Sequence, residues 1–320
     1  MFRPTKNLAW ALILGLMPFT ITSCDDDDDD PMMTNTIADV ASSDARFSSL
    51  VAALDRAGLV PTVSGTDEYT VFAPTNDAFA TFLMDNGFAT LEDVPVDLLT
   101  NVLLNHVVGG EVRSTDLTNG YIKTAATEAT TMNTLRALVD LTGGVFINGS
   151  TEVTEADIDA DNGVIHAVNE VIALPTVVNL AIDNSGLFST LVAALTRADL
   201  TADFVGILTG DGPFTVFAPT NDAFQALLDS DPTWTVLADI PVATLEAVLS
   251  YHVVAGANVL SSTLTDGQVV GTFGGSDLTI NIAGADVSIT TSSAGSSNIV
   301  ATDVQGINGV VHVIDAVLIP

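Results

Sequence analysis

The chain has 320 residues, and 40 Asp and Glu against 8 Lys and Arg give it a formal net charge of −32. This charge excludes a nucleic-acid partner, because binding to a phosphate backbone needs clustered Lys and Arg side chains. With 48% hydrophobic and only 15% charged residues, the chain is too apolar for an acidic disordered protein, and its length predicts about two domains.

Residues 1–23 are typical of a bacterial export signal. A basic start is followed by fourteen uncharged residues, 8–21, fewer than the roughly 20 that a membrane-spanning helix needs. The run ends in Ile-Thr-Ser-Cys, which resembles a lipobox, so Cys24 is predicted to carry a lipid that anchors the chain to a membrane. The alternative is an ordinary secretory signal. A lone cysteine can supply neither an intramolecular disulfide nor a zinc site of several thiolates.

Six aspartates, Asp25 to Asp30, follow Cys24 directly. Like charges repel one another, so residues 24–35 are predicted to form an extended, solvated tether. The position of the run also resembles the surface-export signal of some outer-membrane lipoproteins, although acidic residues there mark inner-membrane retention in other bacteria. We expect an exported protein anchored at the outer membrane, at the cell surface or facing the periplasm.

The rest of the chain is one unit that occurs twice. Four pairs of segments match: 47–59 with 188–200, 70–79 with 215–224, 105–108 with 251–254, and 162–166 with 308–312. The offset grows from 141 to 146 residues, a period that matches a whole domain and exceeds the roughly 20 to 50 residues of a solenoid repeat. The sequence therefore predicts two domains, 36–175 and 176–320.

Each copy begins with helical patterns and ends with strand patterns. Apolar residues at 47, 50, 51 and 54 share one helix face before Gly58, and a β-rich run at 69–73 is followed by Pro74 and by Thr75, a helix-capping residue. A further helix is predicted over 95–105. After it, short Val, Ile and Thr runs such as 144–149 and 277–282 predict strands and turns. This order indicates an α+β fold.

Three of the repeated motifs resemble the fasciclin domain family. They are TVFAPTNDAF at 70–79 and 215–224, the histidine that follows the third helix, and NGVIHAVNEVI at 162–172 with NGVVHVIDAVL at 308–318. The resemblance covers both copies and implies two tandem domains, each a β-wedge or twisted sandwich of about seven strands with packed helices. It also implies a role in adhesion. Asn105 stands where the second copy has Tyr251, so an interaction that needs the phenol is not expected in the first copy.

All four histidines occupy repeated positions, His106 with His252 and His166 with His312. Two histidines and a carboxylate can hold zinc or iron. Their Val and Ile neighbours instead favour buried imidazoles that bond to backbone groups, and the family resemblance implies the same.

The TVFAPTNDAF motif opens a predicted helix with Asn76 and Asp77, repeated as Asn221 and Asp222. The motif lacks the glycines and lysine of a phosphate loop. These side chains are therefore predicted to bond the free N–H groups of the first helical turn and to favour its positive end, rather than to bind a ligand.

Residues 157–163 superficially resemble a calcium loop, but Asn162 and Val168 stand where an EF-hand needs Gly and Glu. A looser surface calcium site stays open, and no other cofactor is expected. Resemblance to animal members of the family implies another role, because an Asp followed by an aliphatic residue belongs there to integrin-contact motifs. The candidate adhesion contacts are Asp157, Ile158, Asp303, Val304 and Tyr251. The alternative for the Asp-aliphatic pairs is an ordinary turn that leads into a strand.

The sequence contains no G-x-S-x-G nucleophile motif, and no catalytic set can be read from it. The predicted function is therefore non-catalytic adhesion or binding, with surface or matrix proteins, polysaccharides or a second copy of the chain as partners. The alternative is a carbohydrate-binding or hydrolytic envelope protein that uses Asp and His sets. Beyond residue 24 only six Lys or Arg remain, with Lys123 the single lysine. This balance predicts a fold that high salt stabilises.

Overall fold

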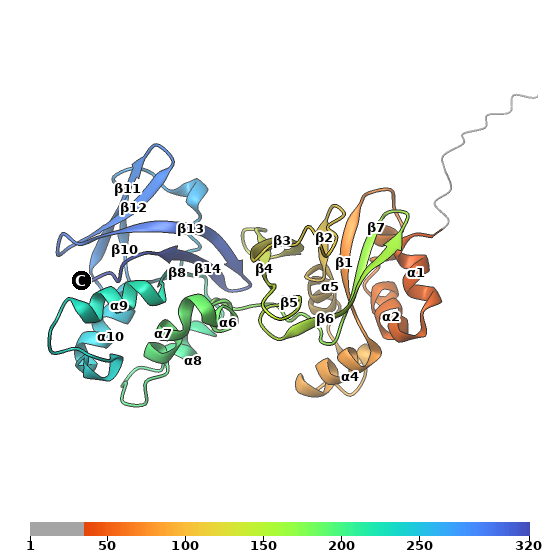
Figure 1. Ribbon diagram of the computed structural model, residues 1–320, viewed down its shortest axis with the longest axis horizontal. Coiled ribbons are helices and arrows are strands. Elements are labelled where there is room, and N and C mark those ends of the chain that lie inside the picture. The colour runs from red at the N-terminus through yellow and green to blue at the C-terminus, as the bar shows by residue number, and fades with distance from the viewer. Residues whose placement is uncertain (1–34) are drawn as a thin grey trace, which may run out of the picture. The chain divides into compact units, whose positions relative to one another are not determined.

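Each sequence copy forms a seven-stranded sheet with helices packed against it (Figure 1). The computed structural model describes residues 35–320. The predicted signal peptide, Cys24 and nearly all of the acidic tether lie outside the described residues. No helix of residues 35–320 has both the length and the apolar character needed to cross a bilayer. The predicted α+β fold of two tandem domains is confirmed.

The first copy contains all of its helices before its last six strands. Its helices are α1 (Ile37–Ser43), α2 (Ser48–Arg56), α3 (Val60–Val63), α4 (Asn76–Asp85) and α5 (Val96–Leu104), with short 3-10 turns η1 (Ala45–Phe47) and η2 (Leu91–Asp93). Its strands are β1 (Tyr69–Pro74), β2 (Val107–Gly109), β3 (Gly120–Thr127), β4 (Thr134–Asp140), β5 (Phe146–Ile147), β6 (Thr151–Ala160) and β7 (Gly163–Val168).

The second copy repeats this order. Its helices are α6 (Val177–Asp183), α7 (Ser185–Leu195), α8 (Phe204–Leu208), α9 (Asn221–Asp229) and α10 (Val242–Tyr251), with 3-10 turns η3 (Leu237–Asp239) and η4 (Ser261–Thr263). Its strands are β8 (Phe214–Pro219), β9 (Val253–Ala255), β10 (Val269–Gly271), β11 (Asp277–Ala283), β12 (Asp286–Thr291), β13 (Ser296–Gly306) and β14 (Gly309–Ile314).

The two most strongly repeated motifs are neighbouring strands. The first sheet has the order β2-β1-β7-β6-β5-β4-β3, and the second has the order β10-β11-β12-β13-β14-β8-β9. In each sheet the first long strand and the last strand pair in parallel, β1 with β7 and β8 with β14, whereas the other pairs are antiparallel. The motifs that begin and end each copy therefore meet inside one sheet.

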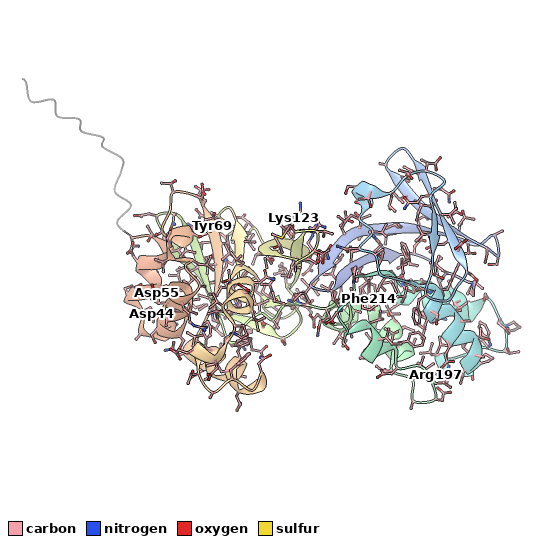
Figure 2. The ribbon with its side chains drawn as sticks, turned by 180° about the vertical axis from the view of Figure 1, so that it is seen from behind. Asp44, Asp55, Tyr69, Lys123, Arg197 and Phe214 are labelled. Carbon is pink, nitrogen blue, oxygen red and sulfur yellow. The ribbon has the colours of Figure 1, made fainter. Side chains whose placement is uncertain are left out.

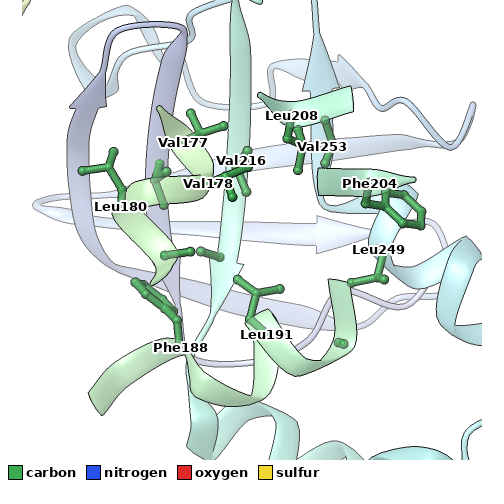
Figure 3. Packing of buried hydrophobic residues seen from close by; sticks show 14 of the residues in the cluster. Val177, Val178, Leu180, Phe188, Leu191, Phe204, Leu208, Val216, Leu249 and Val253 are labelled. Carbon is green, nitrogen blue, oxygen red and sulfur yellow. The ribbon is translucent and has the colours of Figure 1, made fainter. Parts of the chain in front are cut away.

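Both faces of these central strands are covered. All six residues of β7 and all six of β14 are buried, which explains why the strands read as nearly continuous apolar runs rather than alternating ones. In the second copy, one face packs against α6, α7, α8 and α10 in the cluster drawn in Figure 3. The other face packs against β10, β11 and β12. The core thus holds the central strands between a helical layer and the later strands of the same sheet.

The local predictions hold with one small difference. Leu50 and Leu54 are buried on one face of α2, and Phe47, directly before the helix, is buried in the same cluster. Gly58 follows the helix with φ +67°, the left-handed conformation that commonly ends a helix. Thr75 caps α4 by accepting a bond from the Ala78 N–H. Pro74, which follows the β-rich run predicted at 69–73, is instead the last residue of β1.

Candidate functional site

Asp157 and Asp303 both lie at bulges. The ladder between β6 and β7 shifts register between Glu155 and Ile158, and Asp157 there has φ +60°. The ladder between β13 and β14 shifts in the same way, and Asp303 has φ +58°. A bulge redirects the strand, and Asp is one of the few residue types that adopt this left-handed conformation readily.

The carboxylates of these aspartates are engaged by neighbouring backbone and hydroxyl groups. The Ser114 N–H donates to Asp157 over 2.8 Å, and the Ser114 hydroxyl donates to the other carboxylate oxygen. The hydroxyl bond is the main reason that the pKa of Asp157 lies below its usual range. Ser261 makes the same two bonds to Asp303. Each aspartate therefore fastens a loop to the bulge.

His166 and His312 bridge the same loop and bulge. The Asp157 N–H donates to Nδ1 of His166 over 3.2 Å, and Nε2 of His166 lies 3.0 Å from the Val112 carbonyl oxygen. His312 makes the equivalent contacts, with the Asp303 N–H at 3.4 Å and the Val259 carbonyl at 2.8 Å. Both imidazoles are 0% exposed. Since both ring nitrogens face backbone groups, no nitrogen remains for a metal.

His106 and His252 have a different setting, at the junction of a helix and the following strand. Nδ1 of His106 lies 2.8 Å from the Val102 carbonyl, and Nε2 accepts a bond from the Ile172 N–H. Burial lowers the pKa of His106, and equally that of His252, to about 4. Among the residues that the structure describes, no three His, Cys, Asp or Glu side chains gather in a metal-binding group.

Two of the five predicted adhesion contacts do not reach the surface. Tyr251 is 0% exposed, and its hydroxyl donates to the Asp277 carbonyl over 2.6 Å. Val304 is 3% exposed because the residue after the bulge points into the core. The assignment of these residues as direct contacts is therefore wrong in this fold. Ile158 is half-buried against the first core, and Asp157 and Asp303 keep part of their surface.

Asn105 stands in the first copy where the second has Tyr251, and its side-chain amide forms hydrogen bonds inside the domain. Its Nδ2 donates to the carbonyls of Ile172 and Ala173, and its Oδ1 accepts from the Thr124 hydroxyl. The residue is 0% exposed. The substitution thus changes the internal bonding and not a surface.

The prediction for Asn76 and Asn221 is also corrected. Asn76 does not bond the first turn of its own helix α4. Its Oδ1 accepts bonds from the Ser49 N–H at 2.9 Å and the Ser48 hydroxyl, and its Nδ2 donates to the Ala45 carbonyl. Asn221 bonds the start of α7 in the same way, through Thr190, Ser189 and Gly186. Because Thr75 and Thr220 already cap α4 and α9, each asparagine joins two helices. Asp77 and Asp222 are exposed in the first turns.

The segment that resembles a calcium loop is the hairpin between β6 and β7. Asn162 at its turn is 0% exposed. Its Oδ1 accepts from the Ile37 N–H, and its Nδ2 donates to the carbonyls of Val63 and Gly65. The turn therefore fixes the helices that begin the domain, and Asn308 does the same in the second copy.

One surface differs strongly between the copies. In the first copy Arg113 forms ion pairs with Glu111 and Asp159. In the second copy the positions of Glu111, Arg113 and Asp159 are held by Asn258, Leu260 and Gln305. The Asn258 amide donates to Gln305 over 3.2 Å. These three positions are thus charged in the first copy and uncharged in the second.

Leu260 and Gln305 of this surface line a cavity of about 160 Å³ together with Asp303, and the other wall holds Lys123 and Arg136 of the first copy. Sequence reasoning missed this site. Lys123 stood out as the single lysine beyond residue 24, but Arg136 lies 13 residues further on. Only the hairpin of β3 and β4 makes the two residues neighbours.

The fold and the repeated contacts define a tandem two-domain protein in which the repeated polar residues fasten loops and helices to the sheet. The fasciclin domain model matches residues 45–175 and 186–320. The chain therefore belongs to the fasciclin domain family. Fasciclin domains are associated with cell adhesion and with surface proteins.

Relatives occur in bacteria and animals. Protein sll1483 of Synechocystis is 39% identical over 140 residues, which cover 44% of this chain and 74% of that protein. Transforming growth factor-beta-induced protein ig-h3 of Sus scrofa is 29% identical over 82% of this chain and 36% of that protein. Human periostin is 29% identical over 83% of this chain and 30% of that protein. The chain thus spans about a third of the length of these animal relatives.

Among solved structures, a fasciclin domain pair from the insect cell adhesion molecule fasciclin I aligns with 84% of this chain and 92% of that chain. The TM-score is 0.47 and the sequence identity is 18%.

Proposed function

We propose that this chain is a non-catalytic adhesion or binding protein that acts through its tandem fasciclin domains on protein or polysaccharide partners. The observation that carries the proposal is the family match of both copies. The histidines support it, because all four use their ring nitrogens for bonds with backbone groups. A second copy of the chain is one of the partners that this function admits.

We further propose that Cys24 carries a lipid anchor and that residues 24–35 form a tether, which places the domains at the outer membrane. The domain bounds that we propose are 36–175 and 176–320. They are supported by α1 and α6, which begin after Thr36 and Thr176 with the same capping box. Two weak sites on one anchored chain raise the overall affinity for a partner that presents many copies of one group.

The hydrolytic alternative has one observation in its favour. Asp183 and Asp140 line the same cavity of about 410 Å³. Burial raises the pKa of Asp183 to about 7, whereas bonds from Thr142 hold the pKa of Asp140 below its usual range. Carboxyl groups whose pKa values are driven apart suit an acid and a base. Hydrolysis of oligosaccharides that disappears in Asp183→Asn, with the fold retained, would establish this alternative.

The adhesive function is tested by comparing cells that carry the chain with cells that lack it. We expect aggregation and surface attachment to fall on deletion, and the purified chain to inhibit attachment of wild-type cells. The same assay with added calcium and with EDTA tests the surface calcium site that the sequence left open. Attachment that neither deletion nor the purified chain changes would contradict the proposal.

A further inference from the structure

Lys123 and Arg136 are two cations without ionic partners in a very acidic protein. Lys123, labelled in Figure 2, lies on β3, and Arg136 on β4 is its direct cross-strand partner. In the part of the chain that the structure describes, neither side chain makes a hydrogen bond or an ion pair. The other described cations all donate bonds: Arg46, Arg56, Arg113 and Arg197.

This arrangement has a cost in the free protein. Like charges directly opposite each other on neighbouring strands are destabilising. Arg136 is also half-buried, and its partial loss of hydration lowers its pKa. Residues 35–320 contain 34 of the 40 carboxylates, yet within this part of the chain both cations lack an ion pair. An anion bound between them would offset the repulsion and the lost hydration together.

The nearest acidic group is held away from the cations. Asp303 lines the same cavity and attracts Arg136, but the two side chains form no ion pair within 4.0 Å. The N–H and hydroxyl of Ser261 hold the Asp303 carboxylate at its bulge. The cavity of about 160 Å³ therefore has a cationic wall and a separate wall that accepts hydrogen bonds.

Next to this wall, one side-chain hydrogen-bond acceptor has no partner among the described residues. Asn258 donates its Nδ2 to Gln305, which lines the cavity, and to Thr131. Its Oδ1 is the single buried side-chain polar atom without a partner in residues 35–320. A buried acceptor that stays unsatisfied costs about 1–3 kcal/mol. Asn258 does not line the cavity itself, so the acceptor that faces a ligand hydroxyl is Asp303, which already accepts from the Ser261 hydroxyl.

We propose that this cavity binds a uronate residue of an acidic polysaccharide. The sugar carboxylate pairs with Arg136 and Lys123, since a guanidinium and a carboxylate match in two parallel bonds. The sugar hydroxyls donate to the opposite wall at Asp303. Sulfate has no such donors, and an acidic peptide side chain carries none beside its carboxylate. The inference rests on the proposed binding function and names the chemistry of the partner.

The test is calorimetric titration of the purified full chain with trigalacturonate, with maltotriose, sodium sulfate and a short polyglutamate as comparisons. We expect trigalacturonate alone to bind measurably at millimolar concentration. The double variant K123Q/R136Q should weaken binding at least tenfold. R46Q is the matched control, because it removes an exposed cation that lies outside the cavity and should leave binding unchanged.

Thermal unfolding separates ligand binding from a purely structural role. Without ligand, K123Q/R136Q should melt at nearly the same temperature, because the repulsion between the two cations that it removes is opposed by the more negative net charge of a chain that already carries −32. Trigalacturonate should raise the melting temperature of the wild type and not that of the double variant. A double variant that melts clearly lower would show that the pair only holds the two domains together, and would overturn the inference.

Equal binding of polyglutamate or of sulfate would also overturn it, in favour of an acidic peptide or a simple anion. The outcome is separable from that of the adhesion assay. If cell attachment depends on the chain but the chain does not bind uronate, only this inference is contradicted. If the chain binds uronate but its deletion does not change attachment, the adhesive function is contradicted and the uronate site is supported.

Discussion

The Nε2 atom of His106 accepts a hydrogen bond of 2.8 Å from the backbone N–H of Ile172, a residue 66 positions further along the chain. The Nδ1 atom of the same ring bonds the Val102 carbonyl. A nitrogen that accepts and a nitrogen that donates require a neutral imidazole with its proton on Nδ1. His252 repeats the arrangement with Leu318 and Val248. In each domain one neutral ring joins the end of a helix to the segment that follows the last strand.

This arrangement predicts that proton uptake by the two rings destabilises the fold as the pH falls below 6.5. Burial lowers the pKa of His106 and His252 to about 4 from 6.5. As the pH falls below 6.5 the unfolded chain takes up protons first, so stability present above pH 6.5 is lost progressively down to about pH 4. Urea unfolding at pH 7.5 and pH 5 should show a loss on the order of 2 kcal/mol for the first domain. In the second domain the loss should be smaller, because burial raises the pKa of Asp183 to about 7 and its protonation in the folded state opposes the effect of His252.

The double variant H106Q/H252Q is the control for this pH dependence. It should be less stable at pH 7.5, because the bonds to Ile172 and Leu318 change, but it should lose much less stability between pH 7.5 and pH 5. Carboxylates such as Asp157 have pKa values below their usual range, so they act below this window. In the second domain Asp183 acts within it in the opposite direction, and His312, whose pKa burial also lowers, keeps part of the dependence. A pH dependence that the double variant keeps in full would contradict the assignment to these two rings.

The second prediction concerns the asparagine that joins two helices. Asn76→Ala removes the bonds to Ser48, Ser49 and Ala45 and should lower the free energy of unfolding by about 2 kcal/mol. Asp77→Ala is the matched control, because the neighbouring side chain is exposed, and it should cost about 0.5 kcal/mol or less. Urea unfolding of both variants measures the difference. Equal losses would show that Asn76 acts locally, as a residue of the first helical turn.

The sequence predicts local structure well where a signal lies within a few residues. Thr75 next to a helical pattern indicates a cap, and the apolar spacing from Phe47 to Leu54 indicates a helix face, and both are found. Asn76 stands at the same helix start, but its partners lie 27 to 31 residues earlier. No spacing within the motif contains that information, because the packing of α2 against α4 creates the contact.

The third prediction follows from the burial of Tyr251. Its hydroxyl donates to the Asp277 carbonyl and accepts from the Ser292 N–H. Tyr251→Phe leaves both backbone groups without this partner and should cost about 1–2 kcal/mol of stability. Cell attachment by the variant should not change, because the side chain is 0% exposed. Lost attachment with unchanged unfolding in urea would restore Tyr251 as a contact residue.

The fourth prediction concerns the glycine at the start of β7. A Cβ atom at Gly163 would lie 1.8 Å from the Tyr69 carbonyl oxygen on the parallel strand β1, and the backbone there has φ +138°. Gly163→Ala should therefore cost more than about 3 kcal/mol, since neither backbone can move without breaking the ladder. Gly58→Ala tests positive φ alone, because no atom lies within 4 Å of its Cβ position, and should cost about 1 kcal/mol.

Unfolding of both variants in urea distinguishes the close approach from the backbone conformation. If Gly163→Ala does not fold, Gly309→Ala provides the same test in the second domain, where the Cβ would lie 2.2 Å from the Phe214 carbonyl oxygen. Costs for Gly163 and Gly309 no larger than that for Gly58 would argue against the tight pairing of the first and last strands.

The candidate binding site shows the limit of sequence reasoning most clearly. The short Val, Ile and Thr runs after His106 predict strands, but they do not predict which residues of β3 and β4 face each other. The pairing of Lys123 with Arg136 depends on register, and the neutral wall at Gln305 becomes visible only when the two copies are compared position by position. Asp157 and Asp303 were found from sequence, but their bonds to Ser114 and Ser261 come from loops 43 and 42 residues away.

The last prediction concerns salt. A net charge of −32 with only six cations beyond residue 24 makes the folded surface repel itself at low ionic strength. Molar salt shortens the screening length to about 3 Å, so the repulsion that unfolding would relieve becomes small. The melting temperature should rise on the order of 5 °C or more between low salt and molar NaCl.

Two comparisons separate screening from general effects of salt on hydration. Sucrose at the same osmotic strength should give a smaller rise, because it does not screen charge. Choline chloride should act nearly as well as NaCl, because screening depends on ionic strength and not on a specific cation. A melting temperature that stays constant from low to molar NaCl would mean that the aspartates are spaced widely enough to repel one another little, and the acidity would then need an explanation other than adaptation to salt.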